Sequence, residues 1–153
     1  MTAQDAMEAF VGSEHTEENW LKAWPLLRKG TALEPHGVEL ISVNDDEILL
    51  SMEIGPHAHQ PFGLLHGGIS MLLAESAASM HSCWKLGIPA EYPVGIEISG
   101  SHIRGASQGL VHVVGTVIRR SRTLVHHQVQ IIEVETGKVL STIRVTNLIR
   151  RTE

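Results

Sequence analysis

The stretch "QPFGLLHGGISMLLAES", residues 60–76, passes from turn residues through a glycine pair into an apolar run that contains one carboxylate, Glu75. The run continues as "ISMLLAESAASMHSCWKL" over residues 69–86, without alternation and without a clean polar face. Ala, Leu, Met and Ser dominate it, and these residues suit a helix that is crowded on most sides. We therefore expect a helix over residues 67–86 that lies in the core of the protein.

Strand-like segments lie on both sides of this helix. Before it, "GVELISVNDDEILLSMEI" (residues 37–54) indicates a hairpin, because apolar residues alternate from Ile48 to Ile54 and "NDD" supplies turn chemistry. After it come "YPVGIEISGSHI", "GLVHVVGTVIRR", "LVHHQVQIIEVE" and "KVLSTIRVTNLI", with the short turn "TGK" between the last two. In the first of these four segments, Val94, Ile96 and Ile98 are expected on one face. Long antiparallel strands and one apolar helix predict an α+β fold with the sheet wrapped around the helix.

The first 36 residues are expected to form an N-terminal helical segment beside a main domain over residues 37–153. Within "SEHTEENWLKAWPLLRKG" (residues 13–30), Thr16 is a plausible N-cap followed by glutamates, and Lys and Arg precede Gly30. Pro25 is expected to kink this helix or to mark a break in it. Residues 57–66 are expected to form a loop.

Composition excludes several classes of protein. A chain of 153 residues with a formal charge of −5 has the size of one domain and is not basic, as nucleic-acid binders usually are. No apolar stretch is long enough to span a membrane, and the N-terminus lacks the pattern of a signal peptide. Cys83 is the only cysteine, so no intrachain disulfide is expected and a cytoplasmic location is the default. The ten histidines show no HExxH or Cys/His spacing, so no metal site is predicted.

The glycine pair Gly67–Gly68 stands where the chain would enter the helix. The first helical N–H groups lack intrahelical acceptors and lie at the positive end of the helix dipole. Glycine lets a ligand approach the backbone closely, so a carbonyl oxygen that gains negative charge could be held there, as in an oxyanion hole. An ordinary start of a helix explains the same two residues without any ligand.

Glu75 is the most informative residue of the stretch. A carboxylate on a buried helix is costly unless it is paired or used, and an apolar setting makes it a stronger base. It would suit a general base or a nucleophile, although it could also face a polar interface or cap a neighbouring backbone. Ser79 lies one turn later on the same face, where it could orient a water or simply ease close packing. Gln60 carries an amide that could donate to a carbonyl.

Distance constrains how these residues act together. Gly67 and Glu75 are eight residues apart, which is roughly 12 Å along a helix axis. One chain therefore cannot bring its Gly67 N–H and its Glu75 to the same reacting carbonyl. If both act, they come from different chains, and a dimer with two symmetric sites at its interface is predicted.

The motifs above resemble those of the hotdog-fold acyl-CoA thioesterases, in the branch of the 4-hydroxybenzoyl-CoA, 1,4-dihydroxy-2-naphthoyl-CoA and enterobactin-associated enzymes. The resemblance rests on "QPFGLLHGG…LLAES", on "VGIEISGSHIR" (residues 94–104) and on "HHQVQI" (residues 126–131), and it covers roughly residues 37–149. It implies the hotdog fold, a dimer formed by joining two sheets, and a pairing of dimers into tetramers.

The resemblance also implies roles for matching residues. Glu75 would attack the thioester carbonyl or activate a water, and the Gly67 N–H of the other chain would polarise that carbonyl. Gln60 would assist the polarisation, His66 would shape the same region, and Ser79 would supply a hydroxyl near the carboxylate. The CoA part of the substrate would lie near the surface, against two groups of residues. These are Gly95, His102, Ile103, Arg104 and Gly105, and then Arg122, Thr123, Leu124, Val125, His126 and His127.

The implied function is hydrolysis of an acyl-CoA thioester with an aromatic or otherwise compact acyl group. No cofactor is required, since CoA is part of the substrate. A non-catalytic acyl-CoA binding protein on the same fold is the alternative, because fold alone does not establish function. A hydratase or dehydratase would use an Asp/His pair that this helix does not show. The sequence leaves open the acyl group, a carrier protein in place of CoA, and whether Glu75 acts as nucleophile or as general base.

Overall fold

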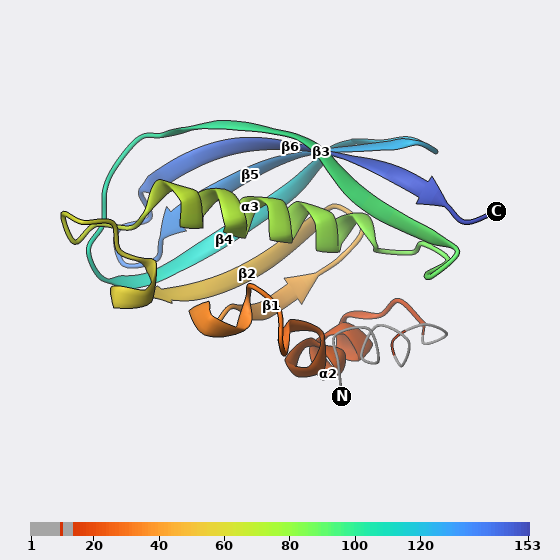
Figure 1. Ribbon diagram of the computed structural model, residues 1–153, viewed down its shortest axis with the longest axis horizontal. Helices are drawn as coiled ribbons and strands as arrows, with labels where there is room; N and C mark the ends of the chain where they lie inside the picture. Colours follow the sequence, from red (N-terminus) through yellow and green to blue (C-terminus); the bar gives the residue numbers. More distant parts are fainter. Residues whose placement is uncertain (1–9, 11–13) are drawn as a thin grey trace.

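The computed structural model describes Phe10 and residues 14–153, and it shows one antiparallel sheet with a long helix packed along it (Figure 1). The helices are α2 (Glu17–Arg28) and α3 (Gly67–Ser82), with short 3₁₀ turns η1 (Glu34–His36) and η2 (Pro56–Ala58). The strands are β1 (Glu39–Val43), β2 (Glu47–Ile54), β3 (Glu91–His102), β4 (Gly109–Arg120), β5 (Leu124–Glu133) and β6 (Val139–Arg151). They are arranged in the order β1-β2-β4-β5-β6-β3, so β1 and β3 are the two edge strands. The predicted α+β hotdog arrangement is confirmed.

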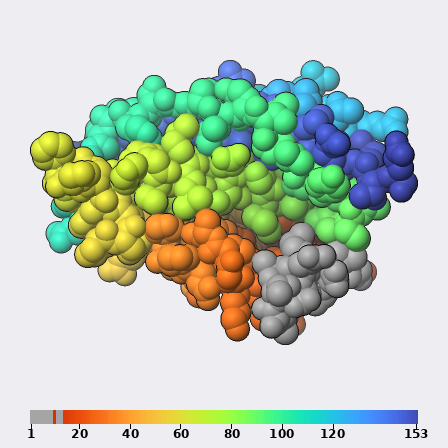
Figure 2. Space-filling view, in the orientation of Figure 1, coloured from red at the N-terminus to blue at the C-terminus, as the bar shows by residue number. Residues whose placement is uncertain are grey.

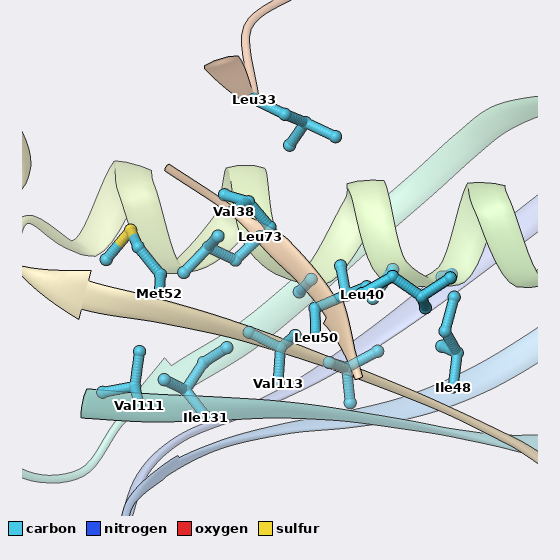
Figure 3. Close-up of a cluster of buried hydrophobic side chains, with 14 of the residues drawn as sticks. Leu33, Val38, Leu40, Ile48, Leu50, Met52, Leu73, Val111, Val113 and Ile131 are labelled. Carbon is cyan, nitrogen blue, oxygen red and sulfur yellow. The ribbon is translucent and has the colours of Figure 1, made fainter. Parts of the chain in front are cut away.

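Helix α3 is the central element, and its sheet-facing side is buried. Leu73, Ala74, Ala77 and Ala78 are fully buried against the strands, and Figure 3 shows Leu73 among side chains of β2, β4 and β5. Small residues on this face let the helix lie close to the sheet. The opposite side of α3 is less covered: in Figure 2 the helix is visible beside β3 on the face of the molecule.

The helix ends at Ser82, four residues before the predicted end at residue 86. Arg120 of β4 donates hydrogen bonds to the carbonyls of His81 (3.0 Å) and Ser82 (3.3 Å). These bonds satisfy carbonyl groups that otherwise lack a partner at a helix C-terminus. Lys85 then adopts a φ of 61°, which is outside the right-handed helical region.

The β1–β2 hairpin forms as predicted. Ile48, Leu50, Met52 and Ile54 alternate into the core and are at most 5% exposed. In the turn, the Asn44 side-chain oxygen accepts from the N–H groups of residues 46 (2.9 Å) and 47 (3.0 Å). The local turn chemistry therefore agrees with the hydrophobic pattern of the strands.

Strand β3 differs from its prediction, because Val94, Ile96 and Ile98 do not share a face. Gly95 pairs with Asn147 and the next paired residue is Glu97, so a bulge leaves Ile96 without a partner in the β3–β6 ladder. An extra residue shifts the alternation by one position. As a result Ile98 packs toward the core, whereas Val94 and Ile96 remain 42% and 55% exposed at the sheet edge.

Helix α2 begins as predicted, with the Thr16 hydroxyl accepting from the Asn19 N–H (3.2 Å). It continues through Pro25 to Arg28, so the alternative of a break at Pro25 is wrong. The part of the predicted N-terminal segment that covers residues 1–9 and 11–13 lies outside the described residues.

The described part of the N-terminal segment packs onto β1 and the C-terminal end of α3. The ring of Trp20 lies edge to face with that of Trp84, with centroids 5.3 Å apart. Glu17 accepts from the backbone N–H of Val43 (3.0 Å), and Trp24 donates to the backbone carbonyl of Val38 (2.9 Å). Side chains of α2 thus bond to backbone groups at the outer side of β1. Within the described chain, no helix is long and apolar enough to cross a membrane.

Two histidines are fully buried beneath the C-terminal end of α3. His81 Nδ1 and His127 Nε2 of β5 lie 2.8 Å apart, and His81 Nε2 lies 2.7 Å from the carbonyl oxygen of Asn44. Both contacts are satisfied when each ring is neutral and carries its proton on Nε2. Burial lowers the pKa of His81 below its ordinary value and lowers that of His127 to about 3.

The buried pair predicts a loss of stability in mild acid. An unfolded His127 gains a proton near pH 6.5, whereas the folded side chain stays neutral until about pH 3. The unfolded state therefore binds more protons in this window, and the free energy of unfolding falls as the pH is lowered through it. We expect His127 alone to account for a loss of about 2 kcal/mol between about pH 7 and about pH 5.

Urea unfolding at about pH 7 and about pH 5, at fixed protein concentration, measures this loss. His127→Leu should reduce the pH dependence, because it removes the titrating group. His126→Gln is the matched control, since His126 is the neighbouring residue but lies on the opposite side of β5, against Thr146. An unchanged pH dependence in His127→Leu would contradict the assignment.

Candidate active site

The N-terminus of α3 presents a free backbone donor. His66 is the N-cap, and its Nδ1 accepts from the Gly68 N–H at 2.8 Å. In the described part of the chain, no group accepts a hydrogen bond from the Gly67 N–H. His66 thus accepts from the N–H of Gly68. The N–H of Gly67, at the positive end of the helix dipole, is left free to donate to a ligand.

Close packing explains the glycine at position 67. A Cβ there would lie 2.6 Å from His102 Nε2, and His102 is held in turn by a 2.8 Å contact between its Nδ1 and the Ser141 hydroxyl. The imidazole of His102 therefore lies against Gly67 at the start of α3. The sequence predicts His102 among the CoA contacts, and in the structure it lies beside Gly67 and lines the same cleft.

A cleft of about 270 Å³ opens at this point. Its walls include two residues of the predicted catalytic set and four of the predicted CoA set, namely Gln60, Gly67, His102, Ile103, Arg104 and Gly105. The Gln60 side-chain oxygen accepts from the N–H groups of Phe62 (2.5 Å) and Leu64 (3.4 Å). Its oxygen is thus occupied by its own loop, so the amide hydrogens are the part of Gln60 that can serve a ligand.

Glu75 lies elsewhere, and its surroundings correct the prediction. It is exposed in the single chain rather than buried, and α3 carries it next to β3, an edge strand of the sheet. Its carboxylate lies against Gly95 of β3, where a Cβ would collide with Oε1. One turn further along α3, the Ser79 hydroxyl donates to Asn147 Oδ1 at 3.0 Å. Glu75 is not part of the cleft around Gly67.

The second predicted CoA segment, residues 122–127, lies far from the cleft within one chain. Leu124 pairs with Leu148, which pairs with Val94 near the start of β3, whereas His102 stands at the end of that strand. Eight residues of strand separate Val94 from His102, which is roughly 26 Å. One chain therefore does not bring the two predicted CoA segments together.

Within that segment, Val125 and His127 need a correction. Both are fully buried, because they occupy the core-facing positions of β5, so their side chains cannot reach a ligand at the surface. Arg122 and Thr123 are exposed, while Leu124 and His126 are partly buried. These four residues remain candidates for CoA contacts.

Two polar residues on the core face of β6, Ser141 and Asn147, were not among the predicted site residues. Both are buried among apolar neighbours, and each touches a residue of the predicted site, His102 and Ser79 respectively. A polar residue at a core position of an alternating strand is the signal that could have found them. Among the described residues, no group of three or more His, Cys, Asp or Glu side chains is arranged to hold a metal ion.

Comparison with known proteins identifies the family. Residues 62–140 match the Thioesterase superfamily. A 1,4-dihydroxy-2-naphthoyl-CoA hydrolase of Listeria monocytogenes is 33% identical over 118 residues, which cover 77% of this chain and 94% of that protein. The chain belongs to the thioesterase superfamily.

Two further similarities agree with this assignment. The putative esterase PA1618 of Pseudomonas aeruginosa is 40% identical over 87 residues, which cover 57% of this chain and 60% of that protein. A crystal structure of a mutant of thioesterase PA1618 from the same organism superposes with a TM-score of 0.82 at 30% identity, covering 86% of this chain and 94% of that one. These findings support thioester hydrolysis as the activity of this superfamily member.

The contact between Glu75 and Gly95 yields a prediction. Gly95→Ala adds a Cβ where Oε1 of Glu75 now lies, so the carboxylate must move by about 1 Å or more. We expect kcat for thioester hydrolysis to fall about a hundred-fold, the usual effect of such a displacement of a reacting group. Release of thiol, followed with a thiol-reactive dye, measures the rate.

Gly87→Ala is the matched control, because a Cβ at Gly87 would meet only Glu91 Oε2, at 3.6 Å. It should keep the wild-type rate. Both variants should unfold at temperatures close to that of the wild type. A fully active Gly95→Ala would show that the position of Glu75 does not matter for the reaction.

Proposed function

We propose that this protein hydrolyses an acyl-CoA thioester with an aromatic or otherwise compact acyl group, giving the free acid and CoA. The observation that carries the proposal is the free Gly67 N–H at the start of α3, which lies with Gln60 in the same cleft. Two donors at one point are what a carbonyl oxygen needs when it gains negative charge. The hydrolase named above from Listeria monocytogenes acts on an aromatic acyl-CoA, which supports the choice of acyl class.

In the proposed reaction the thioester carbonyl oxygen accepts hydrogen bonds from the Gly67 N–H and the Gln60 amide. Glu75 either attacks the carbonyl carbon or removes a proton from an attacking water. The carbon–sulfur bond then breaks and CoA leaves as the thiolate, which takes up a proton. If Glu75 has attacked directly, water then hydrolyses the acyl–Glu75 anhydride to give the free acid. His66 maintains the free Gly67 N–H by capping Gly68. The reaction requires no metal and no cofactor.

Two chains are needed to complete this site. Glu75 lies against Gly95, and Gly67 lies against His102. If the β3 strands of two chains pair antiparallel about a two-fold axis, Glu75 meets Gly67 of the other chain when Gly95 stands opposite His102. This register places the axis close to Ile98 and Ser99. The pairing is supported by the apolar edge of β3, where Tyr92, Val94 and Ile96 are exposed.

The same register joins the two halves of the proposed CoA site. With Gly95 opposite His102, Val94 of one chain stands opposite Ile103 of the other. The segment beginning at Arg122, which lies two strands from Val94, then approaches the cleft that contains Arg104. Arg side chains at both positions suit the phosphates of CoA. The family resemblance adds a pairing of two such dimers into a tetramer.

The role of Glu75 is tested by substitution. Glu75→Ala should lower kcat by at least about a thousand-fold, because it removes the only carboxylate that the proposal uses, and Glu75→Asp should retain part of the activity. Thiol release is measured over benzoyl-, hydroxybenzoyl-, phenylacetyl-, hydroxynaphthoyl- and fatty acyl-CoA. Glu53→Ala is the control, since Glu53 is an exposed carboxylate on β2. Binding of these esters without turnover by the wild type would favour an acyl-CoA binding protein.

The two-chain site is tested by mixing variants. Gly67→Pro removes the free N–H at the first position of α3, where proline is compatible with a helix and where His66 has a ψ of 127°, as a residue before proline prefers. Its Cβ also displaces His102, so the variant disables the start of α3 and leaves Glu75 of the same chain in place. Homodimers of Gly67→Pro and of Glu75→Ala should both be inactive. Mixed dimers should contain one intact site of two, so random mixing restores about a quarter of the wild-type activity.

Co-expression of the two variants with different affinity tags gives the mixed dimers, and kcat per chain is compared with the unmixed variants. If each chain held its own complete site, each site in the mixture would still lack one group. Absence of any restored activity in verified mixed dimers would therefore overturn the two-chain arrangement.

A further inference from the structure

Asn147 is a fully buried polar residue that the proposed chemistry does not yet use. It lies on the core face of β6, between Val145 and Ile149 on the same face. Burial of an uncharged amide in such a position costs free energy of folding unless its hydrogen-bonding groups have partners. Its contacts therefore indicate what it does.

The Asn147 amide makes one contact and lacks another. Its Oδ1 accepts a hydrogen bond from the Ser79 hydroxyl at 3.0 Å. Its Nδ2 is buried and has no hydrogen-bond partner among the residues that the structure describes. A buried donor without a partner usually costs about 1–3 kcal/mol. An apolar residue at this position would avoid that cost, so the amide is not explained by packing alone.

Asn147 is also adjacent to Glu75. In the β3–β6 ladder Asn147 stands opposite Gly95, and Gly95 has no side chain because the Glu75 carboxylate occupies that space. Side-chain positions of directly opposed residues lie about 5 Å apart. The carboxylate of Glu75, the hydroxyl of Ser79 and the amide of Asn147 thus form one cluster where α3 crosses β3 and β6.

We propose that Asn147 is a positioning residue that holds the Ser79 hydroxyl as a hydrogen-bond acceptor for the attacking water; this inference rests on the function proposed above. Because Ser79 gives its proton to Asn147, its oxygen can only accept on the side of Glu75. A water between the two residues then donates one hydrogen to Glu75 and the other to Ser79. Its lone pair is left to face the thioester carbon.

The step balances without a further reactant. The water oxygen bonds to the carbonyl carbon while one water proton passes to Glu75. The carbon–sulfur bond breaks, the electron pair stays on sulfur, and the proton on Glu75 passes to the leaving thiolate. Ser79 and Asn147 exchange no proton with the substrate. The inference therefore selects water attack, with Glu75 as general base, over a covalent bond to Glu75.

A double-mutant cycle tests the inference. Ser79→Ala removes the acceptor, and Asn147→Leu removes the group that orients it while keeping a branched side chain with the same number of heavy atoms. Without Asn147 the Ser79 proton can turn toward Glu75 and compete with the water. We expect Ser79→Ala and Asn147→Leu each to lower kcat about ten-fold or more with little change in KM. The double variant should be no slower than the slower single variant, because both remove the same interaction.

Ser82→Ala is the matched control, since Ser82 is a buried serine on the same helix whose hydroxyl bonds only to the Ala78 carbonyl (2.7 Å). It should keep the wild-type kcat. Asn147→Ala is made beside Asn147→Leu in case the larger side chain does not fit.

Turnover in ¹⁸O-labelled water should leave peptides that contain Glu75 unlabelled, because in the proposed step water and not Glu75 forms the bond to the carbonyl carbon.

Four results would overturn the inference. These are a wild-type kcat in the Asn147 variants, losses that multiply in the double variant, label in Glu75, and failure of both Asn147 variants to form the wild-type oligomer. The last would assign Asn147 a structural role. An active Glu75→Ala, or a wild type that hydrolyses no thioester, would instead refute the proposed function and the inference with it.

Discussion

The close approach of α3 to β3 is the constraint on which the rest of the site depends. At both ends of this contact a glycine replaces a side chain: Gly67 of α3 touches His102 of β3, and Gly95 of β3 touches Glu75 of α3. The small residues on the buried side of α3 allow the helix to lie this low on the sheet. The bulge at Ile96 comes directly after Gly95 and shifts the alternation of the side chains that follow in β3 by one position. Helix packing and strand irregularity therefore fix Glu75 and the free N–H of Gly67 in place together.

Under the proposed mechanism, one helix carries both the group that binds the thioester carbonyl, at its start, and the catalytic carboxylate, near its middle. The start of α3 supplies hydrogen-bond donors, and the exposed side of the same helix supplies the carboxylate, about two turns away. Neither part does chemistry alone under the proposed mechanism. Assembly about a two-fold axis is then part of catalysis, because each chain contributes the half that the other lacks.

Much of the fold could be predicted from local pattern. The apolar run after Gly68 predicts a core helix, and the alternation around Leu50 predicts the hairpin, because side-chain burial follows the period of each element. The resemblance of the motifs to a known family predicted Gln60 and Gly67 at one place, and the cleft brings them together.

Other features depend on contacts between distant segments. The bulge in β3 arises from pairing with β6, and the end of α3 depends on Arg120 of β4, so neither is visible in a local pattern. Glu75 was expected to be buried, but it lies beside the edge strand β3 and is exposed in the single chain. The burial of His127 could have been predicted, because the alternation in "LVHHQV" indicates that its side chain faces inward. The motif match instead put His127 among the CoA contacts at the surface, whereas its side chain is buried.

The two edge strands of the sheet, β1 and β3, differ in how far other parts of the chain bond to their backbone groups. At β1, side chains of α2 bond to the backbone of Val43 at the end of the strand and of Val38 just before its start, and Arg28 forms a 2.6 Å ion pair with Glu39. An edge whose backbone groups are already occupied is a poor template for another strand. Among the described strands, the β3 edge is the one left free to add another strand. In the proposed two-fold pairing, the β3 edge of each chain is covered by that of the other. The doubled sheet would then have no free edge for further strands, and a protein paired in this way would not grow into fibres.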